Sequence, residues 1–241
     1  MVSVAGKIFI IILFIIGFLV WYKKYKTSPW YLNRLWKTMD DNLRNTKILL
    51  FASLHQMREN LNRDLLILEV GSGGGTNFRY YPDGTRVVCL DINAEYFKFV
   101  DENLKSQNTQ VDVKDFICCN AENLSQFADN TFDAVVSTFV LSSVRKSTSA
   151  VEEIRRVLNK EGAFFFIENV FGKIGDKARV VQRVLAPFYP FLFDGIKLMV
   201  NTDEVITNCG FSKVDFKRIE FEPPIPLLFP LRSAICGSAT K

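Results

Sequence analysis

Continuous apolar runs alternate with stretches of helical periodicity over the middle of the chain. The runs predict strands, and they lie at 65–70, 86–91, 110–120, 132–140 and 163–170. Helices are predicted in the gaps, at about 75–81, 94–105 and 148–158. Strands that are apolar throughout, rather than alternately apolar and polar, are typical of a parallel sheet covered on both faces. The pattern therefore predicts an α/β fold.

The two flanks of this region have different patterns. Before it, apolar residues recur at three- and four-residue intervals across 28–61, beginning with Ser28 as a helix cap and Pro29 in the first turn, which predicts two amphipathic helices. After it, 202–210 has a helical pattern, whereas 211–222 alternates apolar and polar residues and a short strand follows at 233–241. We therefore expect a mostly parallel seven-stranded sheet that ends in an antiparallel hairpin.

Residues 8–22 form an uncharged apolar run of 15 residues. A helix needs about 20 residues to span a bilayer, so this run spans only if the residues before it contribute and the Lys7 side chain snorkels outward. An anchor inserted into one leaflet is the alternative. A cleaved signal peptide is disfavoured because no small-residue cleavage site follows the run. Three lysines follow it and one precedes it, which places the remainder in the cytoplasm. We expect a retained N-terminal membrane anchor helix at 1–26.

Composition narrows the function classes. Hydrophobic residues at 48% and charged residues at 23% exclude a disordered chain. The net charge of +4 equals the four lysines of residues 1–26, so the rest is neutral and no nucleic-acid partner is expected. Five cysteines, an odd number without zinc-type spacing, favour a reducing compartment and predict no metal site.

The chemistry-bearing motif follows the first predicted strand. Glu69 is followed by Gly71, Gly73 and Gly75, and Asp91 stands at the end of the second strand. Glycines between a strand and the next element let backbone N–H groups approach a ligand closely, and a carboxylate at the second strand tip can hold two ribose hydroxyls. The spacing differs from the G-x-G-x-x-G of NAD enzymes.

This arrangement resembles motif I of the class I S-adenosylmethionine-dependent methyltransferases, which have a Rossmann-like fold. Phe132-Asp133 is similar to the F-D-x-V that opens their fourth strand, and 158–162 is similar to the turn before their fifth. The resemblance implies S-adenosyl-L-methionine as cofactor and S-adenosyl-L-homocysteine as product. It implies that the cofactor is bound by Glu69, Gly71, Ser72, Gly73, Gly75, Asp91, Ile92, Ala121, Glu122 and Thr138.

Over its whole length the chain resembles the methyltransferase-like protein seven family. The similar segments are the N-terminal anchor, LLILEVGSGGGTNFRYYP, FDAVVSTFVLSSV, VEEIRRVL and the ending CGSATK. That resemblance implies a membrane-anchored alkyl-thiol S-methyltransferase of the endoplasmic reticulum or lipid droplets, with the catalytic domain facing the cytosol. The expected parts are the anchor 1–26 and a methyltransferase domain 27–241, divided into helices 27–62, a cofactor-binding core 63–170 and an acceptor side 171–241.

Two departures from the family bear on mechanism. Ser72 and Gly74 replace Cys and Thr in the glycine loop, which backbone contacts should tolerate, and strand five ends in Glu168-Asn169 where the relatives have Glu-His. A thiol with a pKa of ~8.5 is already partly ionised at neutral pH, so it needs no strong base. Glu168 and Asn169 are the catalytic candidates, with a polar structural role for Glu168 held equally open.

The acceptor pocket is expected over the ends of strands four and five, formed by Thr138, Phe139, Leu141, Glu168 and Asn169 together with 171–200. Residues 184–193 and 225–231 are apolar without clean periodicity, and they predict either core packing or a substrate mouth that faces the membrane. Three functions remain. They are methylation of small lipophilic thiols, methylation of a lipid or quinone oxygen or nitrogen, and non-catalytic anchoring at an organelle membrane or lipid droplet.

Overall fold

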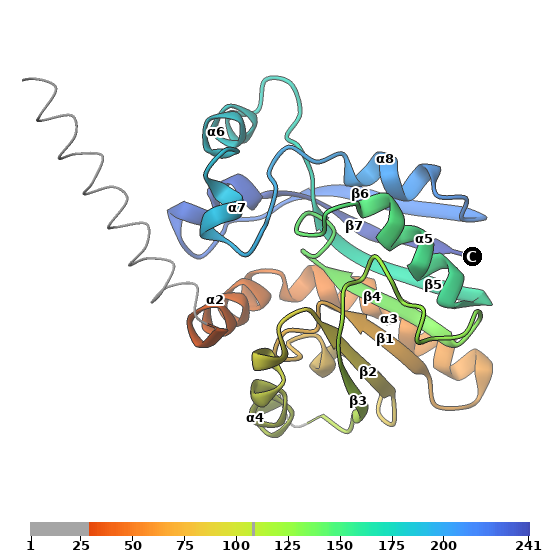
Figure 1. The fold of residues 1–241 in the computed structure, drawn as a ribbon. Helices are drawn as coiled ribbons and strands as arrows, with labels where there is room; N and C mark the ends of the chain where they lie inside the picture. Colours follow the sequence, from red (N-terminus) through yellow and green to blue (C-terminus); the bar gives the residue numbers. More distant parts are fainter. Residues whose placement is uncertain (1–28, 108) are drawn as a thin grey trace, which may run out of the picture.

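The computed structural model describes residues 29–107 and 109–241. It contains one seven-stranded sheet with the order β3-β2-β1-β4-β5-β7-β6 (Figure 1). The parallel strands are β1 (Leu66–Val70), β2 (Arg86–Asp91), β3 (Asp112–Cys118), β4 (Phe132–Thr138) and β5 (Leu158–Asn169). Strand β7 (Ser233–Thr240) runs antiparallel between β5 and β6 (Lys213–Glu220). This confirms the predicted fold, including the antiparallel hairpin.

Helices cover both faces of the sheet. They are α2 (Pro29–Asn42), α3 (Arg44–Leu61), α4 (Lys98–Gln107), α5 (Ser147–Val157), α6 (Lys177–Leu185), α7 (Tyr189–Leu192) and α8 (Thr202–Asn208). Three short 3₁₀ helices complete the described elements: η1 (Phe78–Tyr80), η2 (Ala94–Tyr96) and η3 (Pro226–Leu231). Within the described ranges, no helix combines the length and apolar character needed to cross a bilayer. The predicted anchor, 1–26, lies outside those ranges.

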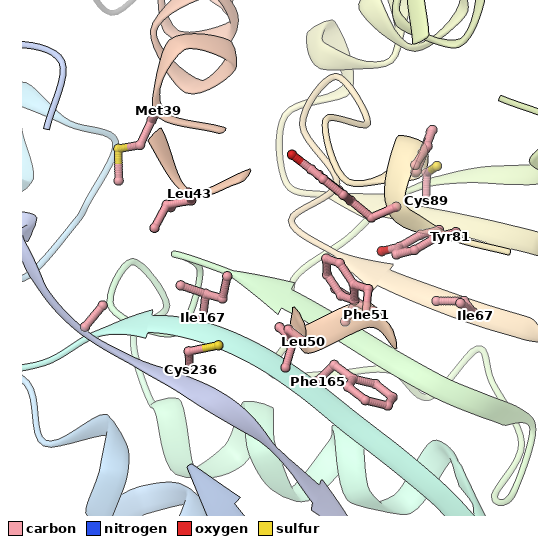
Figure 2. Packing of buried hydrophobic residues seen from close by; sticks show 14 of the residues in the cluster. Met39, Leu43, Leu50, Phe51, Ile67, Tyr81, Cys89, Phe165, Ile167 and Cys236 are labelled. Atoms are coloured by element: carbon pink, nitrogen blue, oxygen red, sulfur yellow. The ribbon is translucent and has the colours of Figure 1, made fainter. Parts of the chain in front are cut away.

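The apolar side chains of the strands divide into two layers. Ile67, Phe165 and Ile167 pack with the N-terminal helices on one face, where Leu50 and Phe51 of α3 point onto the strands (Figure 2). Phe164 and Phe166 face the other way and pack with residues of α5 and α8. Neighbouring strand residues point to opposite faces, so a strand with both faces covered must be apolar at every position.

The predicted helix at 75–81 is wrong: only the 3₁₀ turn η1 forms there. Gly75 has a φ of +76°, outside the right-handed helical region, so it cannot be part of the predicted helix. At the other end, Tyr81 is extended, as expected before Pro82, and ends the turn. The chain after β1 therefore remains a loop packed against α3.

Smaller differences concern element boundaries. Strand β5 begins at Leu158 rather than 163, with a register shift opposite Phe132 and Ala134 of β4. The helix expected at 94–105 is divided into η2 and α4, with the Asn93 side chain accepting the Glu95 N–H at 3.0 Å. These changes leave the carboxyl ends of the parallel strands where the sequence predicts them.

Candidate active site

A cavity of about 450 Å³ lies at the carboxyl ends of β1, β2 and β4. Its size is within the range of small-molecule and cofactor pockets. One end is lined by the glycine loop, by the residues after β2 and by those after β3, and the other end is largely apolar. Helix α2 contributes Leu32, Asn33, Trp36 and Met39 to its wall, so the first described helix covers the site.

The glycine loop has the backbone conformation that its sequence requires. Gly71, Gly73 and Gly75 have φ values of +64°, +50° and +76°, a region that L side chains rarely adopt. A Cβ on Gly71 would lie 2.2 Å from Val140, so the loop also packs tightly against the chain after β4. Gly71, Ser72 and Gly73 line the cavity, whereas Gly75 does not.

Gly74, one of the departures from the family, provides space for two polar side chains. A Cβ there would lie 2.4 Å from Asn33 Oδ1 and 2.7 Å from Asn103 Nδ2, and the Asn103 amide donates to the Gly74 carbonyl at 2.6 Å. Asn33 is buried on the cavity wall, and its Oδ1 has no hydrogen-bond donor among the described residues. A buried hydrogen-bond acceptor without a donor fits a ligand that carries an N–H group.

Asp91 stands at the end of β2 and lines the cavity, as predicted for a ribose ligand. Its carboxylate accepts the backbone N–H groups of Gly73 and Asn93, each at 2.9 Å. Burial raises the pKa of Asp91 above its usual value, against the effect of these hydrogen bonds. Ile92 follows on the cavity wall with its side chain exposed.

Of the two residues predicted to contact the adenine, one lies on the cavity wall. Ala121 lines the cavity and so does Asn120, which the sequence did not single out, whereas Glu122 is not on the wall. The Glu122 carboxylate accepts from Asn120 Nδ2 at 2.9 Å and from the Lys146 N–H. Glu122 thus orients Asn120, whose side chain borders the cavity.

Glu69 lies behind the glycine loop, outside the cavity wall. Its carboxylate accepts from Asn77 Nδ2 at 2.6 Å and from the Tyr81 hydroxyl, and burial raises its pKa to about 7. The Asn77 amide also donates to Thr138 Oγ1 at 3.2 Å, and Thr138 does line the cavity. Glu69 therefore connects to the site through Asn77.

A buried ion pair extends this network into the cavity wall. Lys47 Nζ donates to Asp40 Oδ1 at 2.5 Å and to Asn77 Oδ1 at 2.6 Å. Both Lys47 and Asp40 line the cavity, although their side chains are only 4% exposed. Sequence reasoning missed them because it followed only the apolar positions. The signal was present, since each is a charge on the buried face of a helix, beside Met39 and Leu43.

Glu168 and Asn169 are fully buried and are not on the cavity wall. Glu168 accepts from Ser137 Oγ at 2.5 Å and from the N–H groups of Val140 and Leu141 at 3.1 and 3.0 Å. Burial raises its pKa to about 7 against these hydrogen bonds. The carboxylate thus holds the chain after β4. Asn169 Nδ2 donates to the Lys197 carbonyl at 3.3 Å.

The loop that Glu168 holds presents an aromatic wall to the cavity. Phe139 has a φ of +59°, unusual for a residue with a side chain, and its ring stacks on Trp36 at a centroid distance of 6.5 Å. Phe221 meets the same ring edge-on at 5.8 Å. Trp36, Phe139, Val144, Phe193 and Ile196 form the apolar end of the cavity, where Asp194 also lines the wall and Phe221 does not. Leu141, also expected there, is buried in the core on the other face.

Comparisons with known proteins concern the sequence and the fold of the chain. A methyltransferase domain family matches residues 68–166. The chain is 34% identical to thiol S-methyltransferase TMT1B of Rattus norvegicus, covering 86% of this chain and 82% of the relative. It is also 34% identical to thiol S-methyltransferase TMT1A of Homo sapiens, covering 90% and 86%.

Among solved structures, the fold is similar to that of a SAM-dependent methyltransferase from Methanosarcina mazei. The TM-score is 0.58 at 21% sequence identity, and the match covers 74% of this chain and 92% of that one. At this identity the likeness concerns the fold alone.

Proposed function

The chain belongs to the thiol S-methyltransferase family of S-adenosylmethionine-dependent methyltransferases, and from this premise we propose that it methylates small lipophilic thiols. The observation that carries the proposal is the two-ended cavity. A polar end with Asp91 and the glycine loop continues directly into an apolar end with Trp36 and Phe139. Cofactor and lipophilic acceptor would thus share one cavity.

The described side chains fit S-adenosylmethionine. Asp91 would hold the ribose hydroxyls and Asn120 would border the adenine. At the other end of the loop, the unpartnered Asn33 Oδ1 would accept from the ammonium group, and Lys47 would attract the carboxylate. The bound cofactor supplies an activated methyl group on a sulfonium. The protein's part is to orient the acceptor sulfur toward it and to exclude water.

A thiol acceptor needs less from the site than an alcohol or phenol does. Glu168, near the end of β5, is held by Ser137 and two backbone N–H groups and lies off the cavity wall, whereas Asp194 lines the wall with Phe193 and Ile196. A phenol with a pKa of ~10 needs a base to remove its proton during transfer, whereas a few per cent of a thiol is already thiolate at pH 7. For a thiol acceptor, positioning against the aromatic wall is therefore sufficient for methyl transfer.

An acceptor panel tests this proposal. Purified full-length protein is incubated with methyl-labelled S-adenosylmethionine and an alkyl thiol, a phenol or a lipid amine. We expect a methyl thioether whose rate of formation rises from pH 6 to 9 as thiolate accumulates, and no product from Asp91→Ala. Absence of thioether at every pH, together with methylation of the phenol or the amine, would contradict the thiol assignment while leaving the cofactor site intact.

We also propose that residues 1–26 anchor the enzyme to the endoplasmic reticulum or lipid droplets, with residues 27–241 in the cytosol. Support comes from the 15-residue apolar run, the lysines that follow it and the lack of a cleavage site after it. We expect the protein to resist alkaline carbonate extraction and to keep its first residues. Release by carbonate, or a mature chain that begins after residue 22, would contradict this.

A further inference from the structure

Helix α6 and its flanks expose an unusual series of apolar side chains. Ile174, Val180, Val184 and Phe188 are 91%, 63%, 65% and 58% exposed, and we refer to these four residues as the apolar strip. Single exposed apolar residues are ordinary on a protein surface, but four within residues 174–188, on one helix and its flanks, indicate an interaction site. Figure 1 shows α6 and α7 at the edge of the molecule, away from the helices that cover β1 to β3.

The orientation of α6 is fixed from its buried side. Gln182 is completely buried, and its amide donates to the Val170 carbonyl at 3.1 Å and to the Pro230 carbonyl at 2.8 Å. Its Oε1 accepts the Gly172 N–H at 2.8 Å, and Ala178, one turn earlier, is also buried. Val180 and Val184, also one turn apart, therefore lie on the opposite, solvent-facing side of the helix.

Basic side chains border the apolar strip. Lys173, Lys177 and Arg183 are exposed, and the Arg179 guanidinium lies 3.9 Å above the Phe171 ring. The single acid between residues 173 and 188 is Asp176, whose carboxylate caps α6 by accepting the Ala178 N–H at 2.8 Å. An apolar centre bordered by lysine and arginine is the pattern of a helix that lies in the interface of an anionic membrane.

The strip lies close to the acceptor end of the cavity. Phe188 directly precedes α7, and Phe193 and Ile196, just after α7, line the cavity wall. The opposite wall comes from α2, which begins at Pro29, seven residues after the apolar run 8–22. Seven residues extend at most about 25 Å, so the proposed anchor, on which this step rests, would keep the cavity near the bilayer.

We propose that the apolar strip and its basic neighbours form a second membrane-contact surface. The strip enters the headgroup region of a bilayer that contains anionic lipid, and the lysines and arginines contact the lipid phosphates. This holds the acceptor end of the cavity against the membrane, so that lipophilic acceptors reach Phe193 and Ile196 from the bilayer rather than from water. The contact is separate from the N-terminal anchor.

Photo-crosslinking in nanodiscs tests the contact directly. A benzophenone amino acid is introduced into the full chain at position Val184 or, as the matched control, at Leu49 of α3, which is 67% exposed. We expect lipid adducts at Val184 and none at Leu49, with a higher yield when phosphatidylserine is present. Adducts at both positions or neither, equal yields in neutral discs, or adducts to a second copy or to residues 1–28 would each overturn the proposal.

Kinetics test the consequence. In vesicles, Val184→Asp should raise the KM for a long-chain alkyl thiol severalfold and leave the KM for a short water-soluble thiol unchanged, whereas Leu49→Asp should change neither. A rise for both thiols, or for neither, would overturn delivery from the bilayer. If the wild-type enzyme methylates no thiol at all, the proposed function fails, and the crosslinking result still decides the membrane contact.

Discussion

Two carboxylates at strand ends, Asp91 at the end of β2 and Glu168 at the end of β5, occupy similar places on either side of the central pair β1 and β4. Each accepts backbone N–H groups from the loop that follows the neighbouring strand: Asp91 from Gly73, and Glu168 from Val140 and Leu141. Asp91 nevertheless borders the cavity, whereas Glu168 is fully enclosed. An acid at a strand end can thus hold a loop whether or not it contacts a ligand.

Removing Asp91 should have the largest effect on binding. Charge-assisted hydrogen bonds contribute roughly 1.5 to 3 kcal/mol each, so Asp91→Ala should reduce the affinity for S-adenosylhomocysteine by more than about 100-fold. Titration calorimetry measures this, with circular dichroism as the check that the sheet remains folded. Unchanged affinity would show that Asp91, like Glu168, only holds a loop.

The buried ion pair extends the comparison to the helical wall of the cavity. Lys47→Met removes the buried donor to Asp40 and Asn77, although Asp40 keeps the Arg79 guanidinium and the Tyr80 hydroxyl as partners. Breaking a buried pair completely costs about 3 to 5 kcal/mol, so we expect a smaller loss, of about 1 to 3 kcal/mol, in the free energy of unfolding, measured by denaturant titration. Lys98→Met, which removes an exposed pair with Glu95, is the control and should cost less than about 0.5 kcal/mol.

Glu168 should make stability depend on pH. Because burial raises its folded pKa from 4.5 to about 7, its contribution is complete below pH 4.5 and is lost as the pH rises through 7. This loss is on the order of 3 kcal/mol. Glu168→Gln cannot ionise, so the variant should lose less stability than wild type between pH 5 and 7.5 in parallel denaturant titrations.

The same variant distinguishes a loop-holding residue from a base. The Gln amide nitrogen faces N–H donors, so Glu168→Gln should lower the unfolding free energy at pH 5 by about 1 to 3 kcal/mol while thiol methylation persists at a reduced rate. Loss of turnover with unchanged stability and cofactor affinity would assign Glu168 the role of base. Glu168 would then, like Asp91, act directly on a bound ligand.

Asn169→Ala should have the smallest effect. It removes one long hydrogen bond, 3.3 Å to the Lys197 carbonyl, from a side chain that is not on the cavity wall. We expect thiol turnover to fall by less than about five-fold, corresponding to roughly 1 kcal/mol. A fall of several hundred-fold, measured as kcat with the cofactor saturating, would indicate that Asn169 contacts the acceptor.

The sequence predicted the sheet because its strands are apolar at every position, and it predicted Asp91 because a strand, a glycine loop and an acid have a fixed spatial relation. It could not predict how far each side chain reaches into the cavity. Glu69 and Asp91 both belong to the motif, yet packing against Asn77 and Tyr81 places Glu69 behind the loop. Whether Asn33 and Asp40 line the cavity depends on where α2 lies across the sheet. Periodicity alone does not determine that position.

Strand β7 has a consequence for how the enzyme folds. It pairs with β5 from Ala163↔Thr240 to Asn169↔Ala234, so a loop of more than 60 residues must close before this half of the sheet forms. That loop contains α6, α7 and the cavity residues Phe193 and Ile196. Closing long loops slows folding. The acceptor side, 171–241, should therefore become protected from proteases after the cofactor-binding core, 63–170.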